Sequence, residues 1–465
     1  MSDRLEALRT ALAGVPAWLV GGAVRDELMG RVTGDYDVAV AGDPKAAARA
    51  VARATGATSF PLSEAFGAWR VVGGEGWHVD LVGLRNSDLQ TDLEARDFTI
   101  NAMARPLEGG ELVDPTGGAD DLQASRLRMT SSDAMREDPL RALRAIRFAV
   151  ELGVEIEPST ASEVAAAAPG LAGVAGERVF GELRRLVCAP APVAALRMLE
   201  SHGLMDVVLP ELAALRGVEQ SVFHHLDVYE HTLEVLDAVV VLECDPAAAG
   251  LDRHAAAIVA LLAEPLSDEL TRGQAMRFAA LLHDSAKPAT RGVTPEGRVT
   301  FMGHDRAGVK LAGTVMRRLR TSQRLADYVA ALTRSHLRLG YLVHERPLTR
   351  RAAWRYLEET SPYEPETTIF TVTDRLATRG RNAGPAIAAH VELASEMLDH
   401  AFARRREGRP AAPVRGNELM RELGIAPGPD LGRLIAHLEE DAYAGEVTSS
   451  EEALSRARAL LAGGA

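Results

Sequence analysis

Two aspartates in the segment Gly34-Asp35-Tyr36-Asp37 are the first residues whose spacing suggests chemistry. If residues 36–40 form a β-strand, Asp35 and Asp37 are two positions apart and project from the same face. Two neighbouring carboxylates repel each other, and a divalent cation relieves that repulsion. The alternative is a surface turn with two solvated aspartates, which a DxD pattern would favour on its own.

A pair of glycines a dozen residues earlier weakens that alternative. Trp18-Leu19-Val20 is a short apolar run typical of a buried strand, and Gly21-Gly22 follows it directly. Glycine lets the backbone turn sharply and approach a ligand, and N–H groups at a helix start can bind phosphate. Together with the two aspartates, this turn predicts a site for a metal-bound triphosphate.

Asp80 is a candidate third acidic group, because residues 77–82 alternate like a strand. Such a site could direct a hydroxyl in line onto an α-phosphate. One metal ion would lower the pKa of the hydroxyl, and the other would steady the leaving pyrophosphate.

Histidines farther along the chain suggest a second centre. His231, the pair His283-Asp284, and Asp374 have the order H…HD…D. On helices these side chains can converge on one divalent metal, and the apolar run 278–282 predicts that the His-Asp pair is buried and needs a partner. His304 and His336 could complete a second metal position, and Lys287 could bind phosphate. We assign the remaining candidates to structural or surface positions: His224, His225, His254 and His437.

The composition sets the bounds within which these sites must be built. A chain of 465 residues predicts two to four domains, and 47% hydrophobic with 25% charged residues is typical of a globular protein. A net charge of −13 argues against wholesale coating of nucleic acid. Two cysteines, and no run of 18 apolar residues or signal-peptide pattern, predict a cytoplasmic location.

The order of predicted elements divides the chain. Residues 1–125 alternate helix and strand signals, with a helix over 44–55, strands over 69–72 and 77–82, and a helix starting over 98–104. Helices then take over, including amphipathic stretches at 134–152 and 177–187. We predict an α/β head over 1–125 and helical domains over 126–215, 216–390 and 391–465, with an exposed connector at 404–413.

Five motifs occur in an order that resembles one family. They are GGAVRD at 21–26, the Asp35/Asp37 pair, ARDFTINAMA at 95–104, DPTGGADDL at 114–122 and EDPLRALRAIRF at 137–148. Their order is similar to that in class II tRNA nucleotidyltransferases and bacterial poly(A) polymerases, and GIAPGPDLGRL at 424–434 resembles the family's tail. The histidine set resembles the HD phosphohydrolase superfamily. The resemblance implies a polymerase-β-like nucleotidyltransferase head followed by all-α neck, HD and tail domains.

The resemblance also implies roles for individual residues. Gly21, Gly22, Arg25 and Arg96 would hold the triphosphate, and Asp35 and Asp37 would bind Mg²⁺. Asp97 would lie near the ribose 2′-hydroxyl, and Asn101 would support the sugar or phosphate. Gly117 and Gly118 would form a hinge between head and neck; the alternative for them is an ordinary turn.

Asp138 and Arg141 form a possible template for the base. Three positions apart on a predicted helix, they would point to one face. Cytosine and adenine both present an amino donor beside a ring-nitrogen acceptor, which a carboxylate next to a guanidinium matches; guanine and uracil have the opposite polarity. The alternative is a surface salt bridge worth only ~0.3 kcal/mol. Arg144 and Arg147 continue the spacing and could hold phosphate or orient the pair.

Two departures from the family pattern bear on activity. The family usually has a second arginine where this chain has Ala95, and Arg105 or Arg85 could take its place. Members that add the full CCA end carry a flexible loop of roughly twenty residues before this motif, longer than most ordered connections. Here only residues 86–91 are available. In this family the missing loop resembles CC-adding enzymes.

We therefore expect CMP transfer from CTP to a tRNA 3′ end, with ATP as a possible second substrate. The HD domain would use Mg, Mn, Co or Ni to hydrolyse phosphoesters, such as 2′,3′-cyclic phosphates at damaged tRNA ends. Arginines within 315–338 and 404–409 could contact tRNA phosphates or form solvated helix faces. The alternatives are full CCA addition, an HD phosphohydrolase whose head only binds RNA, and a non-catalytic scaffold; poly(A) addition is disfavoured. We expect no membrane or protein partner.

Overall fold

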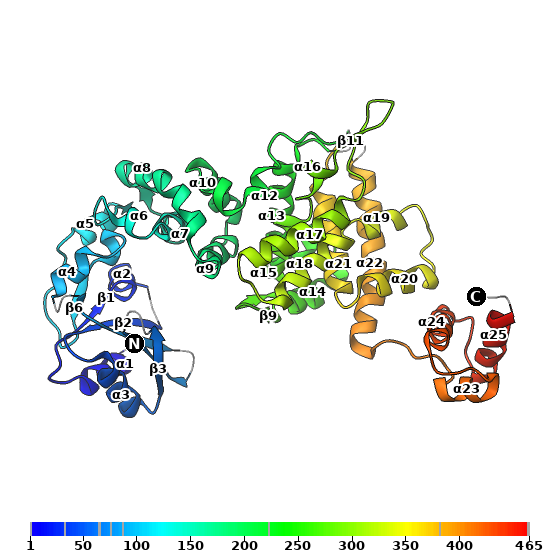
Figure 1. Ribbon diagram of the computed structural model, residues 1–465, viewed down its shortest axis with the longest axis horizontal. Helices are drawn as coiled ribbons and strands as arrows, with labels where there is room; N and C mark the ends of the chain where they lie inside the picture. The colour runs from blue at the N-terminus through cyan, green and yellow to red at the C-terminus, as the bar shows by residue number, and fades with distance from the viewer. Residues whose placement is uncertain are drawn as a thin grey trace. The chain divides into compact units, whose positions relative to one another are not determined.

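The computed structural model describes residues 2–31, 34–63, 67–74, 77–85, 88–221, 224–380 and 383–462. Contacts divide the chain into two compact units (Figure 1): Met1–Ala189 with Ala194–Val208, and Pro190–Val193 with Leu209–Ala465. Within the described ranges, no helix has the length and apolar character needed to cross a membrane.

A six-stranded mixed sheet forms the α/β part of the first unit, in the order β3-β4-β5-β2-β1-β6. Its strands are β1 (Ala17–Val20), β2 (Asp35–Val40), β3 (Thr58–Ser63), β4 (Ala68–Val72), β5 (His78–Gly83) and β6 (Ala104–Pro106). The two central strands, β2 and β5, run parallel, and the other neighbouring pairs are antiparallel. The predicted α/β head is confirmed.

The two faces of this sheet have different coverings. Helices α1 (Ser2–Ala11) and α3 (Pro44–Thr55) bury Leu8 and Val51 against one face, where Tyr36 also lies. The segment with α4 (Leu89–Glu94) covers part of the other face, where Leu93 packs on Val20 and Ala39. Because side chains alternate along a strand, Asp35 and Asp37 share the face of Ala39.

Local sequence signals explain where the helices of the head begin. Helix α3 starts at Pro44, which suits a first helical turn, and the Asp43 carboxylate accepts a hydrogen bond from the N–H of Lys45. Helix α2 (Gly22–Leu28) follows Gly21 directly. The predicted helix start over 98–104 is wrong: only a 3₁₀ turn, Thr99–Asn101, forms before strand β6.

The predicted helix over 134–152 is interrupted. It consists of α6 (Ala134–Glu137) and α7 (Leu140–Leu152), with Asp138 in an extended conformation between them. Pro139 causes the break, because a residue before proline is disfavoured in the α region. The rest of the first unit comprises α5 (Gly118–Gln123), β7 (Arg126–Leu127), β8 (Glu155–Ile156), α8 (Pro158–Ala167), a 3₁₀ helix (Ala168–Gly173), α9 (Gly176–Val187), α10 (Pro192–Ser201) and α11 (Met205–Val208).

The second unit is almost entirely helical, as predicted. Its centre contains α13 (Val228–Cys244), α15 (Arg272–Leu282), α17 (His304–Arg318), α18 (Gln323–Ser335) and α21 (Glu364–Leu376), which pack on one another (Figure 1). Around them lie α12 (Pro210–Ala213), 3₁₀ turns at Pro246–Ala249 and Asp252–His254, α14 (Ala255–Leu262), β9 (Pro265–Ser267), β10 (Leu270–Thr271), α16 (Lys287–Thr290), β11 (Gly292–Val293), β12 (Val299–Thr300), α19 (Arg338–Leu342) and α20 (Arg350–Thr360).

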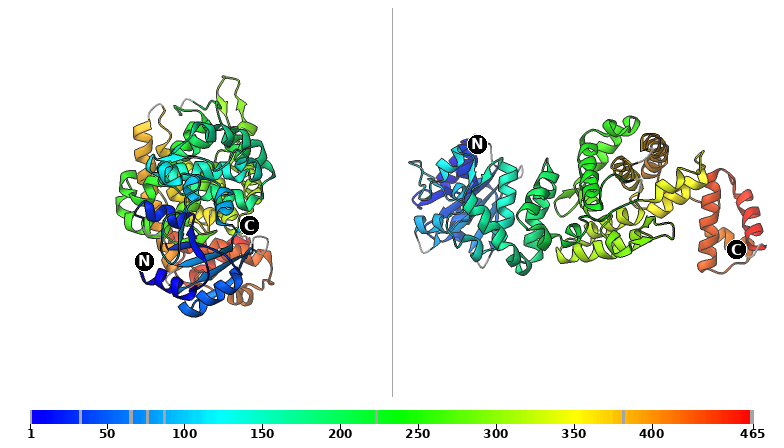
Figure 2. Two further views of the ribbon diagram at one scale, coloured as in Figure 1. Left: turned by 90° about the vertical axis from the view of Figure 1, so that its left-hand side faces the viewer. Right: turned by 90° about the horizontal axis from the view of Figure 1, so that it is seen from above.

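The C-terminal helices have an apolar core of their own. After α22 (Ala383–Glu407) come α23 (Gly416–Leu423), α24 (Pro429–Ala444) and α25 (Ser450–Ala462), which lie together in Figures 1 and 2 and bury Leu419 and Leu438. Part of the predicted connector 404–413 is instead helical. Arg404 belongs to α22 and pairs with Glu358 and Glu364, so it is not exposed.

Candidate functional site

The parallel strands β2 and β5 bring the three acidic candidates of the head onto one face. Asp37 lies opposite Asp80 in the strand register, and Asp35 lies opposite His78, whose Nδ1 is 3.1 Å from its carboxylate. Asp37 remains accessible, yet partial desolvation raises its pKa; Arg96 opposes that rise, and Asp80 and Asp35 add to it. A cation is the partner that such a group of carboxylates favours.

Asp80 has a partner that the sequence analysis missed. Arg70 lies opposite it on β4 and donates to both carboxylate oxygens, each at 2.7 Å. A bidentate arginine neutralises a carboxylate and fixes its orientation. Asp35 and Asp37 therefore fit the predicted role of magnesium ligands better than Asp80 does, because Arg70 already binds the Asp80 carboxylate. The catalytic role of Asp80 stays a prediction.

The Gly-Gly turn lies against these carboxylates. Gly21 has a φ of +67°, and a Cβ there would lie 2.8 Å from Arg96 Nη1 and 3.5 Å from Asp37 Oδ2. The backbone conformation therefore favours glycine, and a Cβ would also displace the end of the Arg96 side chain. On the adjoining helix, Arg25 Nη1 donates to Asn101 Oδ1 at 2.7 Å. The structure thus brings together Gly21, Arg25, Arg96 and Asn101, four of the residues predicted to bind the nucleotide.

Asp97 is buried and has four hydrogen-bond donors. Its Oδ1 accepts from the Phe98 N–H and from Asn101 Nδ2, and its Oδ2 accepts from Arg144 Nε and Nη2 at 2.8 and 2.6 Å. Burial opposes ionisation, but Arg144 and Asn101 outweigh it and lower the pKa of Asp97. Asp97 therefore joins the head to helix α7, and its ribose contact remains a prediction.

Asp138 and Arg141 line one cavity of about 610 Å³, although they do not share a helix. Arg141 Nη2 donates to the Ala95 carbonyl at 3.1 Å. The Asp138 carboxylate lies 2.6 Å from Nη2 of Arg178, a residue of α9 that the sequence analysis missed. No local pattern links positions 40 residues apart, so only the fold identifies this contact.

Arg144 lines the same cavity, but Arg147 is not among its lining residues. The Arg147 side chain is 3% exposed and pairs with Glu182 at 2.5 Å and Glu151 at 3.0 Å. This geometry gives Arg147 a packing role inside the helical neck. Its predicted contact with phosphate gains no support from its position.

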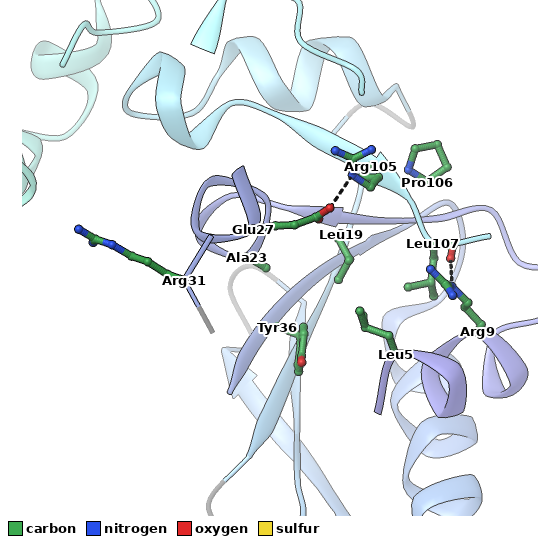
Figure 3. A pocket seen from close by; sticks show the side chains of 10 residues that line it. All are labelled: Leu5, Arg9, Leu19, Ala23, Glu27, Arg31, Tyr36, Arg105, Pro106 and Leu107. Atoms are coloured by element: carbon green, nitrogen blue, oxygen red, sulfur yellow. Dashed lines mark hydrogen bonds and ion pairs between the residues drawn. The ribbon is translucent and has the colours of Figure 1, made fainter. Parts of the chain in front are cut away.

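The two arginines proposed to replace the one absent at Ala95 lie on different faces of the sheet. Arg105 is opposite Leu19 in the strand register and pairs with Glu27 at 3.3 Å, at the edge of a cavity of about 120 Å³ behind Tyr36 (Figure 3). Arg85 instead lines the larger cavity, where its Nη1 lies 3.5 Å from the Ala95 carbonyl.

The histidine candidates converge in the second unit. His231 lies on α13, His283-Asp284 at the end of α15, His304 at the start of α17, His336 at the end of α18 and Asp374 on α21. Their ligand atoms form two groups, each within 4.8 Å: His231, His283 and Asp374, and then Asp284, His304 and His336. All six residues predicted for the metal sites are therefore present in one centre.

Backbone carbonyls orient the imidazoles. The Nδ1 atoms of His283, His304 and His336 lie 2.7–2.8 Å from the carbonyls of Ala280, Phe301 and Thr333. A carbonyl only accepts, so each Nδ1 carries a proton, and in the neutral imidazole each Nε2 presents a lone pair to the centre.

Several polar atoms in this centre need a cation. The Nε2 atoms of His304 and His336 are 3.2 Å apart. Nε2 of His283 and Oδ1 of Asp284 are buried and, within the part of the chain that the structure describes, make no hydrogen bond. Facing lone pairs and unsatisfied buried atoms are costly, and divalent metals would satisfy both. The donor set therefore fits metal binding.

Asp284 lies between the two groups of ligands. Its Oδ1 is 3.4 Å from His304 Nε2, and its Oδ2 is 3.1 Å from His283 Nε2 and 2.6 Å from Lys287 Nζ. One carboxylate oriented in this way could bridge two metal ions. Lys287 also donates to Gln220 Oε1, at 2.6 Å.

His224 is a further residue of this centre, although the sequence analysis assigned it to a structural or surface position. Its ring lies 5.1 Å from that of His231. Desolvation, with Lys287 adding to it, lowers the pKa of His224 to about 3, so the imidazole is neutral. The only indication in the sequence that His224 belongs to this centre was its position seven residues before His231.

The arginine-rich segments are less basic than their sequences suggest, because acids from other elements pair with them. Arg318 pairs with Glu211, and Arg334 with Asp305. Arg405 pairs with Glu264, and Arg409 with Glu358 and Glu439. Contacts of these segments with tRNA phosphates therefore remain predictions without geometric support.

Comparison with known proteins finds matches to the domains that contain these two groups of residues. Residues 17–79 and 70–128 match the poly A polymerase head domain, residues 153–215 match a probable RNA and SrmB-binding site of polymerase A, and residues 228–379 match the HD domain. Two relatives each align with 94% of this chain. An A-adding tRNA nucleotidyltransferase of Deinococcus radiodurans is 39% identical, and the alignment covers 94% of its length. A CC-adding tRNA nucleotidyltransferase of Thermus thermophilus is 34% identical, and the alignment covers 92% of its length.

Solved structures show the same fold. A CCA-adding enzyme in complex with CTP aligns over 99% of this chain and 95% of its own, with a TM-score of 0.64 at 21% identity. A Thermotoga maritima CCA-adding enzyme complexed with tRNA aligns over 98% and 94%, with a TM-score of 0.60 at 21% identity. The chain belongs to the tRNA nucleotidyltransferases of the CCA-adding family, with a poly(A) polymerase head and an HD domain.

Removal of Arg144 should destabilise the first unit in a pH-dependent manner. In Arg144→Ala, Asp97 stays buried without its cation, so its pKa rises above the unfolded value of about 3.9. We expect a loss of about 3 kcal/mol at pH 7, the lower end for a broken buried pair because Arg144 is one-third exposed. The loss should shrink as the pH falls towards 4, because Asp97 then becomes protonated.

Tryptophan fluorescence measures this effect, since Trp18, Trp69 and Trp77 report on the head. The matched control is Arg178→Ala, which removes the more exposed pair with Asp138 and should cost less than about 1 kcal/mol. A loss in Arg144→Ala that stays constant between pH 7 and 4 would contradict the expectation.

Proposed function

We propose that the protein adds CMP from CTP to the 3′ end of tRNA and stops after two additions. The observation that carries this proposal is the short connection between β5 and α4. Strand β5 ends at Gly83 and α4 begins at Leu89, where the Asp88 carboxylate accepts hydrogen bonds from Thr91 N and Oγ1. Asn86 and Ser87 lie outside the described residues. Five connecting residues are too few for a loop that reshapes the base pocket between C and A.

Under this proposal, the head and the cavity divide the work. Mg²⁺ at Asp35 and Asp37 would supply Lewis-acid activation of the RNA 3′-hydroxyl and neutralise charge on the leaving pyrophosphate. Gly21, Gly22, Arg25 and Arg96 bind the triphosphate. Asp138 accepts from the amino group of the base, and Arg141 donates to the adjacent ring nitrogen.

Addition of A is the second candidate. It is favoured by the relative of Deinococcus radiodurans, which is named an A-adding enzyme and is 39% identical over 94% of this chain. Adenine presents the same amino donor and ring acceptor as cytosine, so Asp138 and Arg141 alone accept either base. Full CCA addition combines the two activities.

We also propose that the HD domain hydrolyses phosphoesters such as 2′,3′-cyclic phosphates, with Mg, Mn, Co or Ni bound by its histidines and aspartates. Two ligand groups joined by Asp284 support this, because paired metal ions suit phosphoester hydrolysis. Lys287 and His224 lie beside the ligands and could contact the phosphate. We divide the chain at 1–125, 126–215, 216–390 and 391–465 into head, neck, HD domain and tRNA-binding tail.

A primer-extension assay tests the nucleotide preference. With tRNA that lacks its CCA end, labelled CTP should be incorporated twice and ATP should not follow, because the pocket does not adapt to A. Extension products are resolved by length on a gel. Efficient addition of A to tRNA that already ends in CC would contradict CC addition and favour one of the adenylyl-adding alternatives.

Two substitutions should separate the two centres. Asp37→Ala should abolish CMP transfer, because it removes a ligand of the metal ion that activates the hydroxyl. It should leave metal-dependent hydrolysis of a 2′,3′-cyclic phosphate unchanged. Asp284→Ala should show the reverse pattern, so each variant controls for the folding of the other. Loss of both activities in either variant would indicate one shared site.

A further inference from the structure

The cavity that holds Asp138 and Arg141 contains more arginines than aspartates. Arg85, Arg96, Arg141, Arg144 and Arg178 line it, together with Asp92, Asp97 and Asp138. Each aspartate has one close guanidinium: Asp92 has Arg96 at 3.2 Å, Asp97 has Arg144 at 2.6 Å, and Asp138 has Arg178 at 2.6 Å.

Arg85 and Arg141 are the two cavity arginines with weaker charge compensation. Arg85 Nε lies 3.9 Å from Asp92, which Arg96 already holds more closely. Arg141 Nη1 lies 3.5 Å from Glu137, a carboxylate that does not line the cavity. Guanidinium groups stay charged, so these two keep positive charge to offer a ligand with acceptor atoms. Arg141 also donates to the Ala134 and Ala95 carbonyls, and Arg85 is therefore the more available donor of the two.

The Ala95 carbonyl places the two guanidinium groups side by side. It accepts from Arg141 Nη2 at 3.1 Å and lies 3.5 Å from Arg85 Nη1. The Arg141 N–H in turn donates to the Asp138 carbonyl at 3.0 Å, and Asp138 lies two residues before α7 begins. The backbone bond links Asp138 to Arg141, the shared carbonyl links Arg141 to Arg85, and all three residues line the cavity, which gives it one carboxylate acceptor beside two guanidinium donors.

The pairing edge of cytosine has the complementary groups. It presents the N4 amino donor, the N3 acceptor and the O2 acceptor in a row. Adenine presents its N6 amino donor and N1 acceptor, but has C2–H at the third position. The third group therefore distinguishes the two bases, whereas the first two do not.

We propose that Arg85 is a specificity-determining residue that donates a hydrogen bond to O2 of the incoming cytosine. This inference rests on the proposed base reading by Asp138 and Arg141. A guanidinium that loses water to face O2 regains a hydrogen bond, but one that faces C2–H does not. Arg85 thus favours CTP over ATP in a cavity whose other base contacts accept both.

The short connection between β5 and α4 limits the positions that the Arg85 backbone can adopt. Arg85 lies two residues after β5 ends and three before the Asp88 cap of α4. Its side chain is about half exposed, 53%, so a ligand can reach it. Arg105, the other arginine considered for this role, is held by Glu27 on the opposite face of the sheet and supplies a matched control (Figure 3).

The test compares CTP with 2-thio-CTP, in which sulfur, a weaker acceptor, replaces O2. Affinities are measured by calorimetry on the RNA-free enzyme, and kcat/KM is measured on tRNA that lacks its CCA end. The wild type should prefer CTP by about tenfold, the range for a hydrogen bond to a charged donor. Arg85→Ala should lower the affinity and kcat/KM for CTP by about the same factor and leave those for 2-thio-CTP nearly unchanged. The preference for CTP should therefore disappear.

Two further variants complete the test. Arg85→Lys should retain part of the preference, because it keeps a cationic donor on a less rigid side chain. Arg105→Ala should retain all of it. Equal weakening of both nucleotides in Arg85→Ala would overturn the inference, as would reduced tRNA affinity in a gel shift with the preference unchanged, which would make Arg85 an RNA contact.

This design separates the inference from the proposed function. A wild type that adds only A, yet prefers CTP over 2-thio-CTP in the binding assay, contradicts CC addition alone. A wild type that adds two C residues without that preference contradicts the role of Arg85 alone. Absence of CTP binding contradicts both.

Discussion

The buried ion pair between Asp97 and Arg144 is the interaction on which the geometry of the first unit depends. Asp97 follows the segment that covers the carboxylate face of the sheet, and Arg144 lies on α7, one turn beyond Arg141. Arg141 reinforces the same junction by donating to the Ala95 carbonyl. The position of Asp138 and Arg141, the proposed base-reading pair, relative to Asp35 and Asp37 is therefore set by charge pairing as well as by apolar packing. Because a buried charge without a partner is energetically costly, each residue of this pair requires the other in place.

The two centres collect opposite kinds of ligand. In the head, three carboxylates approach each other on neighbouring parallel strands, and arginines from β4 and from the segment after α4 moderate the negative charge. In the HD domain, backbone carbonyls hold the Nδ1 atoms of three imidazoles, so that their Nε2 atoms lie near the carboxylates of the same two groups. Carboxylate oxygens suit Mg²⁺, and mixed imidazole and carboxylate sets suit transition metals. Each centre thus has its own electrostatic reason to bind a cation.

Residues close in sequence were predictable, and contacts across the fold were not. The spacing of Asp35 and Asp37, the glycine turn at Gly21 and the helix over 44–55 follow from strand alternation, backbone freedom and capping. The H…HD…D order likewise identified His231, His283, Asp284 and Asp374, four of the six residues that converge in the HD domain. By contrast, Arg70 beside Asp80 and Arg178 beside Asp138 come from other elements, so no spacing rule identified them. The break at Asp138 was readable from Pro139, but the amphipathic pattern of 134–152 concealed it.

We propose that the head carboxylates and the Asp138–Arg141 pair act on the same nucleotide. A crystal structure with CTP and Mn²⁺, with manganese located by its anomalous signal, is the decisive measurement. We expect manganese between Asp35 and Asp37, the triphosphate along Gly21 and Gly22, and the cytosine edge against Asp138 and Arg141. A nucleotide bound with its base away from that pair, or manganese found in the HD domain alone, would contradict it.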